Sequence, residues 1–488
     1  MSPYPIGVIM RRSRTSVTQR PPEDPTIPAR PAIWADLPFK GMGISGVQTR
    51  SAFPGAGAMA VAGPRQIADM IGGLGMRVAR FGQVIPGQAF QRNLAGYLRD
   101  MGVRMMGSAT WLPTATNPGE TKEHARLREM VTYWAPGHPE MLIVEPQNES
   151  QRTIQNPGLW DYAGDYGVTQ LQVDHSPALW AARNDLAPTI PVLLPSMATK
   201  RKVGTTITSS WYWRMAKTAA GADFSFAPYV THTNLHSYQG GFRPLMTEIP
   251  SSMAVYIGPQ EMGKAAPGKP AWITETGYHN LVNYTGSHIG TPEDVAGRYV
   301  ARMPFDFYRE LPTLTGWLYY ELVDDSPWRA PGSTPTPDHE EHFGLYFTDW
   351  TGTQDSPRVA FRPKPAAAAL LRLKEWCHDP GSAITAQPLR VRWTGAPTDY
   401  KVHLLQKRSG TWVIAAYRDV SLYNPSTKTR ISVTDTAVRF ELGITPSRIR
   451  TLNVYTGAET AVTIPTDGSN PSFTLQAGPD VWLAEITP

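Results

Sequence analysis

Between residues 41 and 380, short apolar runs alternate with longer helical patterns, and this alternation limits most strongly the folds that the chain can adopt. The runs are almost continuously apolar, which is typical of strands buried on both faces of a parallel sheet covered by helices. The eight expected strands are 41–47, 77–82, 103–110, 142–148, 191–196, 229–238, 271–276 and 316–322. Eight such units predict an α/β fold, a (β/α)8 TIM barrel, with a doubly wound sheet as the alternative.

The pattern changes after residue 380. Segments of alternating apolar and polar residues follow one another, separated by the turn pairs Ser-Gly and Thr-Gly. This is typical of a small antiparallel β-sandwich. We therefore assign residues 35–380 to a catalytic barrel and residues 381–488 to a C-terminal sandwich.

The first 34 residues differ from both regions, because they contain seven prolines, five arginines and only two acids. Proline removes a backbone donor and fixes φ, so we expect an extended arm that docks on another protein chain or in a surface groove. A floppy tail is the alternative. The order of an apolar stretch before arginines is the reverse of a secretory signal, so no standard export signal is expected. A place on a virion, such as a phage tail, fits this pattern, with the cytoplasm as the fallback.

Composition excludes several classes of function. The net charge of +5 and pI of about 9.1 come without a block of lysines and arginines, so nucleic-acid binding is not expected. The single cysteine, Cys377, allows neither an internal disulfide nor a cysteine-based metal site. No apolar run of about eighteen residues is present, so no transmembrane segment is expected.

Two acids stand at strand ends, where a (β/α)8 barrel carries its catalytic groups. Glu149 follows the fourth strand in the sequence Asn148-Glu149, and Glu275 ends the seventh. A pair of carboxylates across a cleft is suited to cleaving a glycosidic bond, since one can hold a proton while the other attacks. An acid at a helix N-terminus is the alternative for Glu149. Glu145 is expected to point into the barrel or into a salt bridge.

Asn-Glu after strand four and a lone Glu after strand seven make the chain resemble the clan A glycoside hydrolases, over about residues 38–380. The resemblance implies a retaining mechanism on a (β/α)8 barrel. It implies that Glu149 is the general acid/base, Glu275 the nucleophile and Asn148 a ligand of the sugar 2-hydroxyl. No cofactor and no metal are required.

Further residues carry the resemblance. It implies that Arg80 keeps the nucleophile ionised and that His236 and Tyr238 contact the substrate and the nucleophile. Many clan members have a Trp at the end of strand eight, whereas this chain has Tyr320 there, three residues after Trp317. The rim aromatics expected to position the sugar are Trp111, Trp317 and Trp328.

The sequence thus predicts a glycosidase acting on a polysaccharide or cell-envelope glycan. The alternative is a non-hydrolytic carbohydrate-binding protein on the same barrel, such as a phage-tail component. The histidines in the sequence His-Glu-Glu-His at 339–342 are three residues apart rather than the four of a helical zinc motif, so no metal is expected there.

Overall fold

A computed structural model describes most of the chain. The described residues are 24–47, 57–81, 89–108, 117–118, 120–146, 164–196, 201–203, 206–208, 222–248, 254–256, 266, 268–284, 289–328, 338–467 and 469–488. Glu149, Asn148 and Trp111 lie outside them, as do residues 1–23. Within the described helices, none is long and apolar enough to cross a membrane.

Seven parallel strands form a curled sheet with the order β6-β5-β4-β3-β13-β12-β9. The strands are β3 (Met42–Ile44), β4 (Val78–Phe81), β5 (Arg104–Ser108), β6 (Leu142–Glu145), β9 (Thr233–His236), β12 (Ala271–Thr276) and β13 (Leu314–Tyr319). Parallel bridges from Val192 to Val144 and from Leu193 to His232 join the two edge strands through residues 192–193. The predicted (β/α)8 barrel is therefore confirmed.

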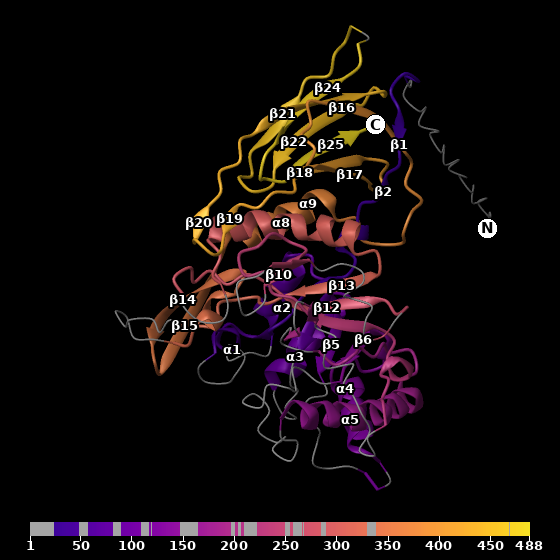
Figure 1. Cartoon of the computed structure of the whole chain (residues 1–488), viewed down its shortest axis with the longest axis vertical. Helices are drawn as coiled ribbons and strands as arrows, with labels where there is room; N and C mark the ends of the chain where they lie inside the picture. Colours follow the sequence, from indigo (N-terminus) through magenta and orange to yellow (C-terminus); the bar gives the residue numbers. More distant parts are fainter. Residues whose placement is uncertain are drawn as a thin grey trace, which may run out of the picture.

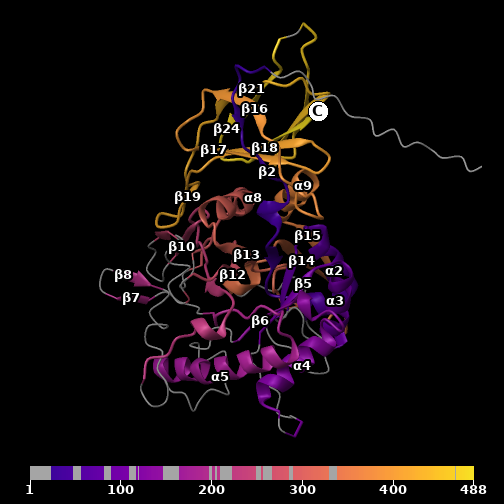
Figure 2. The same cartoon turned by 90° about the vertical axis from the view of Figure 1, so that its right-hand side faces the viewer.

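Helices follow these strands and cover the outside of the sheet (Figures 1 and 2). They are α1 (Ala58–Ala62), α2 (Pro64–Gly73), α3 (Ala89–Asp100), α4 (Lys122–Tyr133), α5 (Gly164–Leu186), α8 (Glu293–Glu310) and α9 (Pro365–Cys377). Short 3-10 helices are η1 (Leu37–Phe39), η3 (Pro139–Met141), η5 (Ala227–Tyr229) and η6 (His339–His342).

Antiparallel pairs interrupt this alternation. They are β7 (Arg201–Val203) with β8 (Thr206–Thr208), β10 (Met246–Glu248) with β11 (Ala254–Tyr256), and β14 (Tyr346–Thr353) with β15 (Ser356–Pro363). None of the eight strands expected from the sequence lies between residues 322 and 380, where the β14–β15 hairpin is found. Its strands alternate between part-buried and exposed positions over most of their length, but with few aliphatic residues.

The inside of the barrel is arranged in layers, because alternate residues of each strand point inward. The lower layer is an apolar cluster made of Val78, Met106, Ile143, Leu193, Trp272 and Leu318. Two residues further along the strands the inward positions become polar, as at Arg80, Glu145 and Thr274. The sequence thus places a polar layer on an apolar floor, at the C-terminal ends of the strands.

The C-terminal region is the predicted sandwich. One sheet has the order β1-β16-β21-β24 and the other β2-β17-β18-β25-β22-β23. The C-terminal strands are β16 (Leu389–Thr394), β17 (Tyr400–Gln406), β18 (Trp412–Arg418), β21 (Thr436–Leu442), β22 (Arg448–Asn453), β23 (Glu459–Val462), β24 (Ser472–Ala477) and β25 (Trp482–Thr487). The short pair β19 (Tyr423–Asn424) and β20 (Thr429–Arg430) extends toward the barrel (Figure 1).

The expectation of an arm up to residue 34 is wrong for its described part. Strand β1 (Ala29–Arg30) pairs with β16, and β2 (Ile33–Trp34) pairs in parallel with β17, so both become edge strands of the sandwich. Ile27 is fully buried, and the Trp34 indole donates to Asp379 at 2.8 Å. Pro28 and Pro31 flank these two short strands and do not interrupt them, so the proline-rich composition of the segment does not prevent the pairing.

The sandwich rests on the barrel through its six-stranded sheet, which faces α8 and α9 (Figure 1). Strand β18 alternates between the two cores: Val413 and Ala415 belong to the large core shared with the barrel, and Ile414 and Ala416 belong to the core between the two sheets. Because one sheet serves both cores, the sandwich and the barrel pack as one continuous body.

Candidate active site

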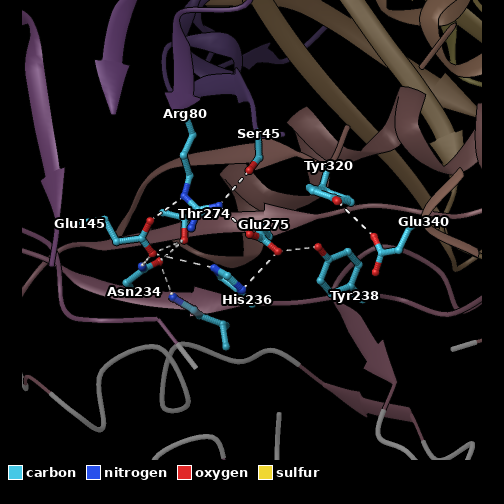
Figure 3. Close-up of polar contacts among 11 residues, drawn as sticks. Ser45, Arg80, Glu145, Asn234, His236, Tyr238, Thr274, Glu275, Tyr320 and Glu340 are labelled. Atoms are coloured by element: carbon cyan, nitrogen blue, oxygen red, sulfur yellow. Dashed lines mark hydrogen bonds and ion pairs between the residues drawn. The ribbon is translucent and has the colours of Figure 1, made fainter. Parts of the chain in front are cut away.

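The polar layer of the barrel is organised around Arg80, whose side chain is only 1% exposed. Its Nε donates to Glu145 Oε2 at 2.6 Å, and its Nη1 donates to Glu275 Oε1 at 2.5 Å and to Ser45 at 3.0 Å. Figure 3 shows the guanidinium between the two carboxylates. Burial alone would lower the pKa of Arg80, but the charges and hydrogen bonds of both carboxylates outweigh it and raise the pKa. The arginine is therefore a permanent cation shared by two acids.

Glu145 is completely buried, as expected from its inward position on β6. Besides Arg80, it accepts hydrogen bonds from Asn234 Nδ2 at 2.8 Å and from Thr274 Oγ1 at 3.3 Å. The prediction that Glu145 points into the barrel and forms a salt bridge is confirmed. With these donors around it, Glu145 acts as a fixed counter-charge and is not placed to exchange protons with a ligand.

Glu275 reaches the same layer because β12 contains an irregularity. In the pairing with β9, Ile273 lies opposite Leu235 and Glu275 opposite His236, which leaves Thr274 as an extra residue. A bulge of this kind lets two successive side chains avoid strict alternation. Thr274 donates to Asn234 at 2.8 Å while its neighbour Glu275 binds Arg80. Glu275 keeps 8% of its surface exposed, unlike Glu145.

The second oxygen of Glu275 faces two other predicted site residues. The Tyr238 hydroxyl donates to Oε2 at 2.6 Å, and His236 Nδ1 lies 3.3 Å from the same oxygen. His236 Nε2 is 3.9 Å from Glu145 Oε1, so the imidazole stands between the two acids. One oxygen of Glu275 thus faces a cation and the other a phenol, an arrangement that fixes the orientation of the carboxyl group.

Aromatic rings form the wall beside Tyr238. Its ring meets Phe343 edge-on with centroids 5.4 Å apart, and Tyr320 lies 6.1 Å away, also edge-on. The Tyr320 hydroxyl donates to Glu340 Oε2 at 3.1 Å, and Glu340 belongs to η6. Burial, together with the negative charge of Glu340, raises the pKa of Tyr320, so this phenol stays protonated and can act as a donor. Tyr320 is half-buried and lies next to Tyr238, the hydrogen-bond partner of Glu275.

Trp317 does not lie in the site, and its assignment as a substrate-binding residue is wrong. It is 2% exposed, and its ring packs edge-on against Phe307 of α8 at 5.5 Å. Leu318 belongs to the barrel interior, so its neighbour Trp317 must point to the opposite side, toward the helices. The alternation of a strand decides this, and it was available from the sequence.

Among the predicted site residues, the structure brings together Arg80, His236, Tyr238, Glu275 and Tyr320. It adds Ser45, Asn234, Thr274 and Glu340, which sequence reasoning missed. Asn234 could have been found, because it lies two residues before His236 on the same strand. Glu340 could not, because it lies in η6 and not at the end of a barrel strand. In the described part of the chain, no group of three or more His, Cys, Asp or Glu side chains is placed to hold a metal ion.

Comparison with known proteins supports the fold. A comparison with protein-family models finds no match, and a comparison with curated protein sequences finds none either. Among solved structures, the GH39 enzyme from Xanthomonas axonopodis pv. citri matches with a TM-score of 0.55 at 12% identity, over 98% of this chain and 99% of that one. A family 51 α-L-arabinofuranosidase from Bifidobacterium longum matches with a TM-score of 0.51 at 9% identity, over 94% and 98%. The chain therefore has the barrel-and-sandwich fold of these glycoside hydrolases over nearly its whole length.

Proposed function

We propose that the protein is a retaining glycoside hydrolase in which Glu275 is the nucleophile and Glu149 the general acid/base. The observation that carries the proposal is the setting of Glu275, a partly accessible carboxylate at a barrel strand end whose two oxygens bind Arg80 and Tyr238. The likeness of the whole chain in fold to glycoside hydrolases is consistent with this function. The proposed substrate class is a polysaccharide or cell-envelope glycan.

In the proposed reaction, Glu275 attacks the anomeric carbon while Glu149 protonates the departing glycosidic oxygen, which gives a glycosyl-enzyme ester. Glu149 then removes a proton from water, and the resulting attack on the anomeric carbon releases the sugar and restores the Glu275 carboxylate. Arg80 and Tyr238 hold the attacking group in one orientation, so little reorganisation is needed before attack. Glu145 takes no part in proton transfer.

The test separates the roles of the two acids. Aryl glycosides and cell-wall polysaccharides are first screened for turnover by the wild type. Glu275→Gln should then lose every substrate, since no covalent intermediate can form. Glu149→Gln should retain a burst with a dinitrophenyl glycoside, which departs without a proton, and azide should restore turnover because an anion needs no general base.

Thermal unfolding of each variant serves as the control for folding. If both folded variants lose the burst and neither responds to azide, the assignment of roles fails. If the folded wild type binds glycans and turns over none of them, the carbohydrate-binding alternative replaces the enzyme.

A further inference from the structure

The segment that carries Tyr238 continues through residues 239–245 and is held at the barrel end by its own contacts. Gln239 Nε2 donates to Thr276 Oγ1 at 2.7 Å, next to Glu275 in the chain. The Tyr278 hydroxyl donates to the carbonyl of Phe242 at 3.0 Å. Both contacts come from the residues that follow Glu275, so the position of Tyr238 and the end of β12 are linked directly.

The same segment touches the sandwich. Arg243 forms an ion pair with Asp419, which lies in the turn that follows β18. Although burial opposes its charge, the hydrogen bond and charge of Asp419 raise the pKa of Arg243. At Gly241, which has φ of +86°, an added Cβ would lie 2.9 Å from the Tyr423 ring. A side chain there would be strained and would collide with the sandwich, so the two surfaces fit closely only with glycine.

The turn after β18 is itself fixed to the barrel. Arg302 of α8 is fully buried and donates through Nη1 to the carbonyls of Arg418 at 2.7 Å and Val420 at 3.1 Å. The Tyr299 hydroxyl accepts from the backbone N–H of Leu422 at 2.7 Å. The backbone around Asp419 is therefore fixed to α8 by hydrogen bonds. Because Asp419 is fixed, its ion pair restrains the position of Arg243.

We propose that the β-sandwich is a positioning element of the active site, in which Asp419 holds Arg243 and thereby the segment that presents Tyr238 to Glu275. The contacts connect Asp419 in the sandwich turn to Arg243 in the barrel loop, and Tyr238 of the same loop to Oε2 of Glu275. The expected effect on kinetics rests on the proposed function. The mechanical link between Asp419 and the segment of Tyr238 is a property of the fold alone. Asp419 and Arg243 act as positioning residues and do not touch the reacting atoms.

A matched control exists at the same domain boundary. Arg298 of α8 pairs with Asp480 of the sandwich at 2.7 Å, and their side chains are 23% and 14% exposed, against 31% and 16% for Arg243 and Asp419. The control pair has a similar exposure but no contact with residues 237–245 in the described interactions. Asp419→Asn and Asp480→Asn in the full chain therefore remove equivalent charges from two places on one boundary.

Hydrogen–deuterium exchange gives the first readout and requires no activity. We expect amide exchange in residues 237–245 to rise about 5-fold or more in Asp419→Asn and to stay at the wild-type level in Asp480→Asn. Asp419→Glu, which restores the charge, should bring exchange part of the way back. Equal exchange in the two Asn variants would overturn the proposal whether or not the protein is a glycosidase.

Kinetics gives the second readout. Asp419→Asn should lower kcat/KM about 3- to 10-fold in the wild type but less than about 2-fold in a Tyr238→Phe background, because the hydroxyl that it positions is then missing. Asp480→Asn should leave kcat/KM unchanged in both backgrounds. If Asp419→Asn has the same effect in both, the sandwich does not act through Tyr238 and the proposal is wrong. Absence of turnover in the wild type refutes the proposed function, and exchange still decides the coupling.

Discussion

Replacing Arg80 by methionine tests whether charge balance holds the polar layer together. The change keeps an unbranched side chain, shorter than that of arginine, but leaves Glu145 and Glu275 without their cation in a site that buries both acids. Removing one partner of a buried ion pair costs about 3–5 kcal/mol, since the remaining charge has no compensation. An unfolding entropy of about 2.1 cal/mol/K per residue gives about 1 kcal/mol/K for 488 residues. We therefore expect Arg80→Met to lower Tm by about 3–5 °C.

The loss of activity should be larger than the loss of stability implies. A hydrogen bond to a charged group contributes about 1.5–3 kcal/mol, so losing the Arg80 contact to Glu275 should reduce kcat/KM about 10- to 150-fold. Calorimetry and aryl-glycoside kinetics measure the two effects separately. Adding Glu145→Gln to Arg80→Met removes one of the two uncompensated charges, so Tm should recover by at least about half.

Activity should not recover in that double variant, because Glu275 still lacks its cation. A single variant that melts within about 1 °C of the wild type, or a double variant no more stable than the single, would refute the charge-balance argument. The melting comparison holds even if no substrate is found. Recovery of both Tm and kcat/KM would instead show that Arg80 serves only to neutralise Glu145.

Four further substitutions test other parts of the structure. Burial raises the pKa of Asp306 to about 7, so its contribution to stability is fully present below about pH 4 and is lost as the pH rises through 7. Between pH 4 and pH 8, the free energy of unfolding of Asp306→Asn should therefore rise by up to about 4 kcal/mol relative to that of the wild type. Urea titrations at several pH values measure this difference. Ile27→Ala should cost about 2–5 kcal/mol, measured as a lower Tm, because Ile27 is fully buried, whereas an arm outside the fold would show no change. Trp317→Leu should lower Tm with KM unchanged, and Tyr320→Leu should raise KM several-fold; the reverse pattern would restore Trp317 to the site.

The barrel could be predicted because its strands are apolar, regularly spaced and separated by helical patterns. The strand-end argument led to Glu275 and the family resemblance to Arg80, and the two side chains meet in the structure. Trp317 was assigned by its distance along the chain from Tyr320, although the two-residue period of β13 places it on the other face. The N-terminal strands could not be recognised, because strands of two residues carry no periodicity and their partners lie more than 350 residues away.

The bulge in β12 was equally hidden, and it explains how one arginine can bind two acids that differ in exposure. Strict alternation would place Thr274 and Glu275 on opposite faces of the sheet, so the sequence alone gives Glu145 and Glu275 no reason to share a cation. The extra residue brings both side chains inward: Thr274 helps to saturate Glu145, while Glu275 retains exposed surface. Glu145, which is fully buried among its hydrogen-bond donors, thereby serves as a counter-charge to Arg80. The acid at the bulge keeps a partly exposed side chain at the end of its strand, as the proposed role of Glu275 requires.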